Sequence, residues 1–104
     1  MQKCKVQILR KSQNGRVIKC ITCGKFHIEY KNLYLTFKPD EFWHFKKYIL
    51  EIDAKHWENL NRDNICSKKV MIPFNHPNVM AMFNAREIDE LKYLCTKDER
   101  TDLN

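Results

Sequence analysis

Alternating apolar and polar residues predict a β-hairpin at the start of the chain. Residues 4–9 and 16–22 alternate on either side of Asn14-Gly15, a pair that favours a tight turn because both residues tolerate a positive φ. Side chains alternate between the two faces of a strand, so one register must bring the apolar residues of both strands to the same face. The register predicted from this turn pairs Val6 with Cys23 and Ile8 with Ile21.

A second hairpin is predicted over residues 26–30 and 33–37, which flank Lys31-Asn32. One register gives this hairpin one apolar face and one polar face. The apolar face holds the pairs Phe26–Phe37, Ile28–Leu35 and Tyr30–Leu33. The polar face holds His27 opposite Thr36 and Glu29 opposite Tyr34.

Apolar residues at helical spacing predict a helix that begins at Pro39 and ends between Ala54 and Trp57. Proline at the first helical position, followed by two acidic residues, is typical of a helix start. The side chains expected to face the sheet are Phe42, Phe45, Ile49 and Ile52. A second apolar stripe, made of Trp43, Leu50 and Trp57, indicates a helix that is either deeply buried or covered by a partner.

The second half of the chain predicts another hairpin and another helix. Strands are expected over residues 69–74 and 79–83, after a polar loop at 58–67, and both faces of this hairpin are apolar. Pro73 cannot donate a ladder hydrogen bond and therefore indicates an edge strand or a bulge. A capping box of Asn84 with Glu87 begins a helix over residues 85–95, whose buried stripe is Ile88, Leu91, Leu94 and Cys95.

These elements predict a single α+β domain over residues 1–104, in which 97–104 form a polar tail. The expected architecture is an antiparallel sheet of about six strands, in the order ββββαββα, with two helices packed on one face. In the alternative arrangement, the hairpin of the second half forms a separate small layer.

Composition points to a cytoplasmic protein with reduced thiols. The first residues alternate in polarity and do not form the apolar stretch of a secretory signal, and no apolar run reaches the length of a membrane-spanning helix. The chain has five cysteines, and an odd number in a chain that is not exported favours thiols or a metal site over a disulfide framework.

Positive charge is concentrated at the start of the chain. The net charge is +6, and residues 1–31 hold eight Lys or Arg against one acidic residue, whereas the remaining 73 residues hold eleven against twelve. A basic first third suggests a negatively charged partner. It is also typical of a solvated, lysine-rich face of a sheet, and this second interpretation is the favoured one.

The sequence C-x-x-C-G at residues 20–24 has the form of a zinc knuckle, in which two thiolates converge on one ion and a glycine lets the backbone turn beneath them. Zinc takes four ligands in a structural site. The predicted set is Cys4, Cys20, Cys23 and His27. The competing interpretation is that these cysteines are small buried side chains. A redox pair is less favoured, because such pairs lie at a helix N-terminus.

The first half of the chain resembles a family of short, uncharacterised bacterial proteins. The residues that carry the resemblance are Cys4, Asn14-Gly15, Cys20-x-x-Cys23-x-x-x-His27, an aromatic-rich strand ending at Phe37, Glu41-Phe42 and Phe45. The resemblance implies a standalone bacterial cytoplasmic protein and brings no activity with it.

No sequence motif of a nucleotide-binding loop, a hydrolase nucleophile or a metalloprotease is present, and no catalytic residues are predicted. We therefore expect a small non-enzymatic interaction or regulatory domain that binds a protein partner or a second copy of itself, with a structural zinc at the knuckle. The alternative is a nucleic-acid-binding module that uses the basic N-terminal hairpins.

Overall fold

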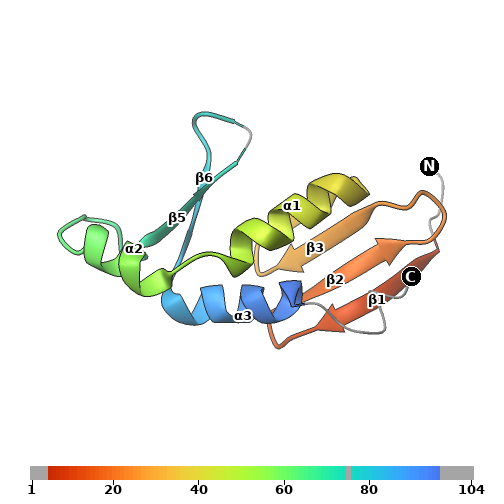
Figure 1. Cartoon of the computed structure of the whole chain (residues 1–104), viewed down its shortest axis with the longest axis horizontal. Helices are drawn as coiled ribbons and strands as arrows, with labels where there is room; N and C mark the ends of the chain where they lie inside the picture. Colours follow the sequence, from red (N-terminus) through yellow and green to blue (C-terminus); the bar gives the residue numbers. More distant parts are fainter. Residues whose placement is uncertain (1–4, 75, 97–104) are drawn as a thin grey trace.

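The computed structural model describes residues 5–74 and 76–96 and confirms an α+β fold (Figure 1). Within these residues, six strands and three helices follow one another along the chain. Their bounds are β1 Val6–Lys11, β2 Gly15–Cys20, β3 Phe26–Tyr30, β4 Leu33–Phe37, α1 Pro39–Leu50, α2 Ala54–Leu60, β5 Val70–Pro73, β6 Met80–Phe83 and α3 Ala85–Cys95. Cys4 and the polar tail at 97–104 lie outside the described residues.

The six strands form two antiparallel sheets rather than one. The larger sheet has the order β1-β2-β3-β4, and β5 pairs with β6 alone, as in the alternative arrangement expected from the sequence. Figure 1 shows α1 and α3 lying together over the larger sheet, while α2 and the β5–β6 ribbon lie at the other end of the molecule. Because β5 is in a two-stranded sheet, Pro73 is in an edge strand, as predicted.

The second hairpin has the predicted register in every pair. Ile28 lies opposite Leu35 on the face toward the helices, and His27 lies opposite Thr36 on the other face. Lys31 turns the chain between the two strands with a φ of 51°, in the left-handed region that few residues other than glycine adopt. The polarity pattern alone was sufficient here because each strand has one apolar and one polar face.

The first hairpin does not have the predicted register. The observed pairs are Val6 with Cys20 and Ile8 with Ile18, instead of Val6 with Cys23 and Ile8 with Ile21. The pairing then shifts between Ile8 and Arg10, which marks a β-bulge. As a result Val17 faces the core and is buried, whereas Val6 and Ile8 lie on the opposite face and are exposed.

The position of Gly15 explains why the observed register of the first hairpin differs from the predicted one. Gly15 is a strand residue of β2, paired with Tyr30 of β3, and not the second residue of a two-residue turn. A Cβ at Gly15 would lie 2.5 Å from the carbonyl oxygen of Glu29, so glycine is needed here because two strands approach closely. The Asn-Gly pair therefore reflects tertiary packing, and the turn that joins β1 to β2 precedes it.

The long helix expected from Pro39 is divided in two. The helix α1 ends at Leu50, and α2 begins at Ala54 after Asp53, whose side chain accepts a hydrogen bond from the backbone N–H of His56 at 3.2 Å. This N-cap offers the backbone an alternative to a continuous helix. The expected polar loop therefore begins only after Leu60.

The last helix, α3, has its predicted bounds and its predicted start. The N–H of Glu87 donates to Asn84 Oδ1 at 2.8 Å, and the N–H of Asn84 donates to Glu87 Oε1 at 2.9 Å, which completes the capping box. The predicted stripe is buried. It packs into one core with residues of both sheets and of α1: Val17, Ile28, Tyr30, Phe42, Ile49, Ile52, Val70, Ile72, Phe83, Ile88, Leu91, Leu94 and Cys95.

Candidate functional site

The loop from Cys20 to Lys25, which contains the predicted knuckle, forms a tight turn. The N–H of Cys23 donates to the sulfur of Cys20 at 3.4 Å, and the N–H of Gly24 donates to the carbonyl oxygen of Cys20 at 2.8 Å. Gly24 has a φ of 78°, a backbone conformation that residues other than glycine rarely adopt. The two cysteines are thereby held on one tight turn between β2 and β3.

The structure describes one further predicted ligand, His27. His27 shares a face of the larger sheet with Ile18, its neighbour on β2. Its imidazole points toward β4, where Nδ1 lies 3.2 Å from Thr36 Oγ1 and the ring lies 5.5 Å from that of Tyr34. In residues 5–74 and 76–96 no three side chains of His, Cys, Asp or Glu are grouped closely enough to hold a metal ion. Because Cys4 lies outside this part of the chain, the four-ligand set stays a prediction.

The two remaining cysteines lie apart from the knuckle. Cys66 is partly exposed in the segment before β5, and Cys95 is fully buried at the end of α3. Burial raises the pKa of the Cys95 thiol to about 12, so this group stays protonated at neutral pH. A protonated buried thiol behaves as a small apolar side chain.

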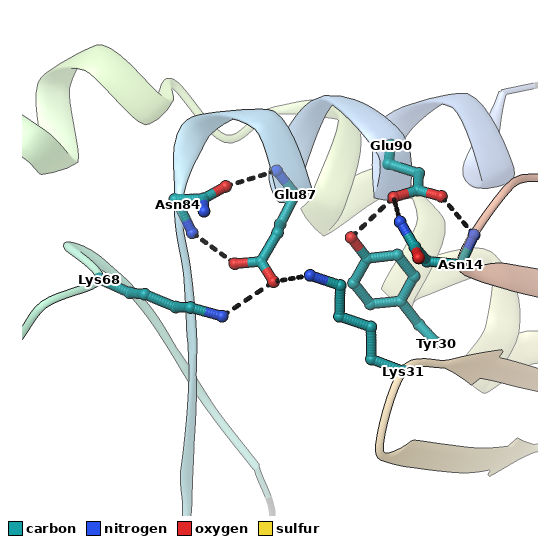
Figure 2. A network of polar contacts seen from close by, with 7 residues as sticks. All are labelled: Asn14, Tyr30, Lys31, Lys68, Asn84, Glu87 and Glu90. Atoms are coloured by element: carbon teal, nitrogen blue, oxygen red, sulfur yellow. Dashed lines mark hydrogen bonds and ion pairs between the residues drawn. The ribbon is translucent and has the colours of Figure 1, made fainter.

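A network of polar contacts joins the two sheets at the start of α3 (Figure 2). The carboxylate of Glu87 is buried and accepts hydrogen bonds from Lys31 at 2.6 Å and from Lys68 at 2.9 Å. Lys31 comes from the β3–β4 turn and Lys68 from the segment before β5. The carboxylate of Glu87 therefore links the β3–β4 turn of the larger sheet to the segment that precedes β5 of the smaller sheet.

Glu90, one turn further along α3, fixes the β1–β2 turn. Its carboxylate accepts hydrogen bonds from the backbone N–H of Asn14 at 2.8 Å, from Asn14 Nδ2 at 2.9 Å and from the hydroxyl of Tyr30 at 2.9 Å. Figure 2 shows Asn14 and Tyr30 approaching Glu90 from the sheet below the helix. Burial, and then the bond to Glu90, raise the pKa of Tyr30, so the phenol stays a donor.

Both carboxylates ionise more readily than usual. Burial alone would raise the pKa of Glu87, but the bonds from Lys31 and Lys68 outweigh it and lower the pKa from 4.5 to about 2. Burial likewise opposes ionisation of Glu90, and the bonds from Asn14, Ser12 and Tyr30 lower its pKa from 4.5 to about 2. Each ionised carboxylate is thus stabilised more by the folded state than by the unfolded state.

These shifts predict a loss of stability in acid. A group whose pKa is lowered by folding contributes its full stabilisation above its unfolded pKa and loses it as the pH falls toward its folded pKa. We therefore expect the urea concentration at the midpoint of unfolding to decrease as the pH is lowered from about 4.5 to about 2. In the variant Glu87→Gln the fall should be shallower. An equal slope in both proteins would contradict the assignment.

One feature of the sequence indicates this network: a charged residue at a position where α3 is otherwise apolar. Glu87 is four residues before Leu91 and seven before Leu94, so a charged residue occupies the buried stripe of α3. A charge at such a position needs partners. Lys31 and Lys68 could not be assigned to it without knowing how the two sheets meet.

A shallow groove runs beside α1. Its first hollow has a volume of about 210 Å³ between α1, the larger sheet and the end of α3, and its lining includes Leu9, Val17 and Leu94. Its second hollow has a volume of about 350 Å³ and includes Lys47 and Leu50. Trp43 and Lys46 line both hollows, so we treat the two as one surface, the α1 groove.

The second apolar stripe predicted for the helix lies largely on the surface. Trp43 is 52% exposed and Leu50 is 41% exposed, while Trp57 is half-buried in α2. The second apolar face predicted for the last hairpin is likewise on the surface, where Met80 and Met82 of β6 are exposed. The stripe was predicted to be either deeply buried or covered by a partner, and deep burial is wrong for Trp43 and Leu50.

Four basic residues of the first third contact other side chains of the protein. Arg10 stacks on Tyr93 at 5.0 Å, Lys19 lies 5.6 Å from the ring of Phe26, Arg16 pairs with Glu29 at 2.9 Å, and Lys31 pairs with Glu87 at 2.6 Å. The pairs of the sheet place Lys19 on the face of the helices and Arg16 on the opposite face. The positive charge is therefore divided between two surfaces.

Comparison with known proteins identifies the family. No curated protein and no solved structure matches the chain. Among the described residues no helix has the length and apolar character needed to cross a membrane. A family model described as "Family of unknown function (DUF6686)" matches residues 1–104. The chain therefore belongs to this family of unknown function.

Proposed function

We propose that this protein is a non-enzymatic domain that binds a partner protein, and that the α1 groove receives an acidic segment of that partner carrying apolar side chains. The observation that carries the proposal is the placement of Trp43, which is 52% exposed and lines both hollows of the groove. Tryptophan is among the residues that contribute most to binding energy at protein interfaces.

The large exposed apolar side chains of the groove are Trp43 and Leu50 on α1. Phe42, Leu94 and Val17 also line the first hollow but are buried. Removing apolar area from water contributes about 25 cal/mol per Å², so Trp43 and Leu50 supply most of the apolar area that a partner would cover.

Charge indicates the chemistry of the partner. The ammonium groups of Lys46 and Lys47 lie over the rings of Phe42 and Trp43, at 5.3 and 5.5 Å. Neither lysine takes part in the ion pairs formed within residues 5–74 and 76–96. Glu51 is the one acidic residue lining either hollow. Acidic side chains flanking the anchor of a partner would complement this rim.

Nucleic-acid binding is the alternative, and the structure gives it less support. A groove binder gathers its basic residues on one surface, whereas Arg16 and Lys31 form ion pairs within the protein and the sheet places Lys19 and Arg16 on opposite faces. Binding of mixed DNA or RNA that weakens steeply with salt would favour this alternative over the α1 groove.

Fluorescence of Trp43 provides a test. The variant Trp57→Phe leaves Trp43 as the one tryptophan, and a helical peptide with Leu and Phe on one face and Glu on the other serves as the probe. We expect saturable binding that changes the emission of Trp43. The double variant Lys46→Glu, Lys47→Glu should weaken it by about tenfold or more, because two contacts of about 1 kcal/mol each are reversed.

Two controls make the test specific. The variant Lys55→Glu changes an exposed lysine of α2, away from the groove, and should leave the affinity unchanged. A peptide with Lys in place of each Glu should bind more weakly than the acidic peptide. Equal affinity for the two peptides, or an unchanged affinity in Trp43→Ala, would contradict the proposal. Sedimentation of the free protein establishes whether a second copy occupies the same surface.

A further inference from the structure

The turn at the end of β2 brings two thiols to one corner of the larger sheet. Cys20 ends β2, and Cys23 follows it within the turn before β3. The sulfur of Cys20 accepts the N–H of Cys23 at 3.4 Å. This hydrogen bond orients the sulfur of Cys20 toward the turn that carries Cys23.

The glycine of this turn is needed for conformation and not for space. Gly24 has a φ of 78°, and a Cβ added to it would meet no atom within 4 Å. The left-handed residue turns the backbone back toward β3, and of the two cysteines before it Cys20 is buried and Cys23 is exposed. A glycine directly after the second cysteine lets the backbone turn beneath the two sulfurs of a C-x-x-C-G loop.

We propose that Cys20 and Cys23 bind a zinc ion, and that each thiol releases its proton when it coordinates the metal. Zinc fits this donor set because thiolates select it among the common divalent ions, and because structural zinc sites use cysteine pairs at this spacing. Of the other predicted ligands the structure describes His27, and coordination by His27 requires its ring to leave Thr36.

The ion would hold three strands at one end of the sheet. The N–H of Cys20 donates to the carbonyl oxygen of Lys25, and the N–H of Ile21 donates to that of Lys5, both at 2.8 Å. The knuckle is therefore tied to the start of β3 and to the residue that precedes β1. Zinc binding to such a turn contributes directly to folding free energy, because no site exists in the unfolded chain.

Metal content of the full chain, purified without chelator, tests the proposal. We expect about one zinc per chain, and its loss from Cys20→Ser and from Cys23→Ser. Cys66→Ser should retain the metal, because Cys66 lies in the segment before β5. Replacement by cobalt should give the sulfur-to-metal charge-transfer absorption of a thiolate site, which reports the ligands without any variant.

Stability provides a second measurement in the unaltered protein. A chelator should lower the melting temperature, and added zinc should restore it. An unaltered chain that folds to the same melting temperature without metal, or a Cys20→Ser, Cys23→Ser variant that keeps its zinc, would overturn the proposal. In the same assay, metal retained by Cys4→Ser or by His27→Ala would remove that residue from the ligand set.

Discussion

The substitution Glu87→Gln is expected to lower the free energy of unfolding by about 3 kcal/mol, because it replaces two hydrogen bonds between charged groups by weaker bonds to a neutral amide. Glu87 is 4% exposed, and its carboxylate lies 2.6 and 2.9 Å from the two ammonium groups, which belong to partly exposed lysines. Urea unfolding at neutral pH, followed by circular dichroism, measures the change. The same substitution removes part of the acid dependence.

Asp89→Asn is the matched control, since Asp89 is an exposed acidic residue on the same helix. Its effect should stay within about 0.5 kcal/mol. A double-mutant cycle of Glu87→Gln with Lys68→Met isolates one of the two pairs. A coupling energy near zero, or an equal cost for Glu87→Gln and Asp89→Asn, would show that the junction between the sheets does not depend on this carboxylate.

The substitution Gly15→Ala should destabilise the protein by about 2–3 kcal/mol through overpacking. The added methyl group would lie 2.5 Å from the carbonyl oxygen of Glu29, 2.9 Å from Tyr30 Cδ1 and 3.1 Å from Leu94 Cδ1. Since the nearest atom belongs to the backbone of β3, side-chain rotation cannot relieve the contact. Thermal unfolding of the variant measures the loss.

Gly24 provides the comparison that separates crowding from backbone conformation. Gly24→Ala is strained by its φ of 78° but meets no neighbour, so it should cost about 1–2 kcal/mol. Asparagine tolerates this conformation, and Gly24→Asn should therefore cost less than Gly24→Ala. At Gly15 the larger asparagine should cost at least as much as alanine. The same ranking at both positions would argue against the crowding at Gly15.

The parts of the fold that followed from the sequence are those in which local signals and tertiary packing agree. In the second hairpin the apolar face defined by Ile28 and Leu35 is the face that the helices cover. In α3 the capping box at Asn84 and the buried stripe act on the same eleven residues. Neither element needed any knowledge of distant neighbours.

The first hairpin and the long helix were predicted less well because a distant or competing contact determines them. Asn14-Gly15 has the composition of a tight turn, yet the backbone of Asn14 binds Glu90 and Gly15 packs against β3. The apolar stripe continues past Leu50, yet Asp53 caps a new helix. In both places the local pattern is real, and a hydrogen bond outside the pattern decides the structure.

For the candidate sites, the sequence was informative about residue types and less so about their arrangement. The C-x-x-C-G spacing predicted the knuckle, and the structure gives its turn a bond from Cys23 to the sulfur of Cys20. The stripe containing Trp43 predicted either burial or a partner, and only the structure shows Trp43 and Leu50 exposed. Whether a surface is covered depends on where other elements pack, which periodicity along one helix does not contain.

The position of α3 after β1–β6 has a consequence for biosynthesis. The four strands of the larger sheet leave the ribosome before α3, so the apolar face that α1 and α3 cover together, which includes Ile28 and Tyr30 at 0% and 1% exposed in the folded protein, stays incompletely covered until α3 emerges. The carboxylates that clamp the β1–β2 and β3–β4 turns arrive with the same helix. A nascent chain stopped before residue 85 would present a partly uncovered apolar sheet to chaperones and proteases. Folding of this domain is therefore completed only after α3 has left the ribosome.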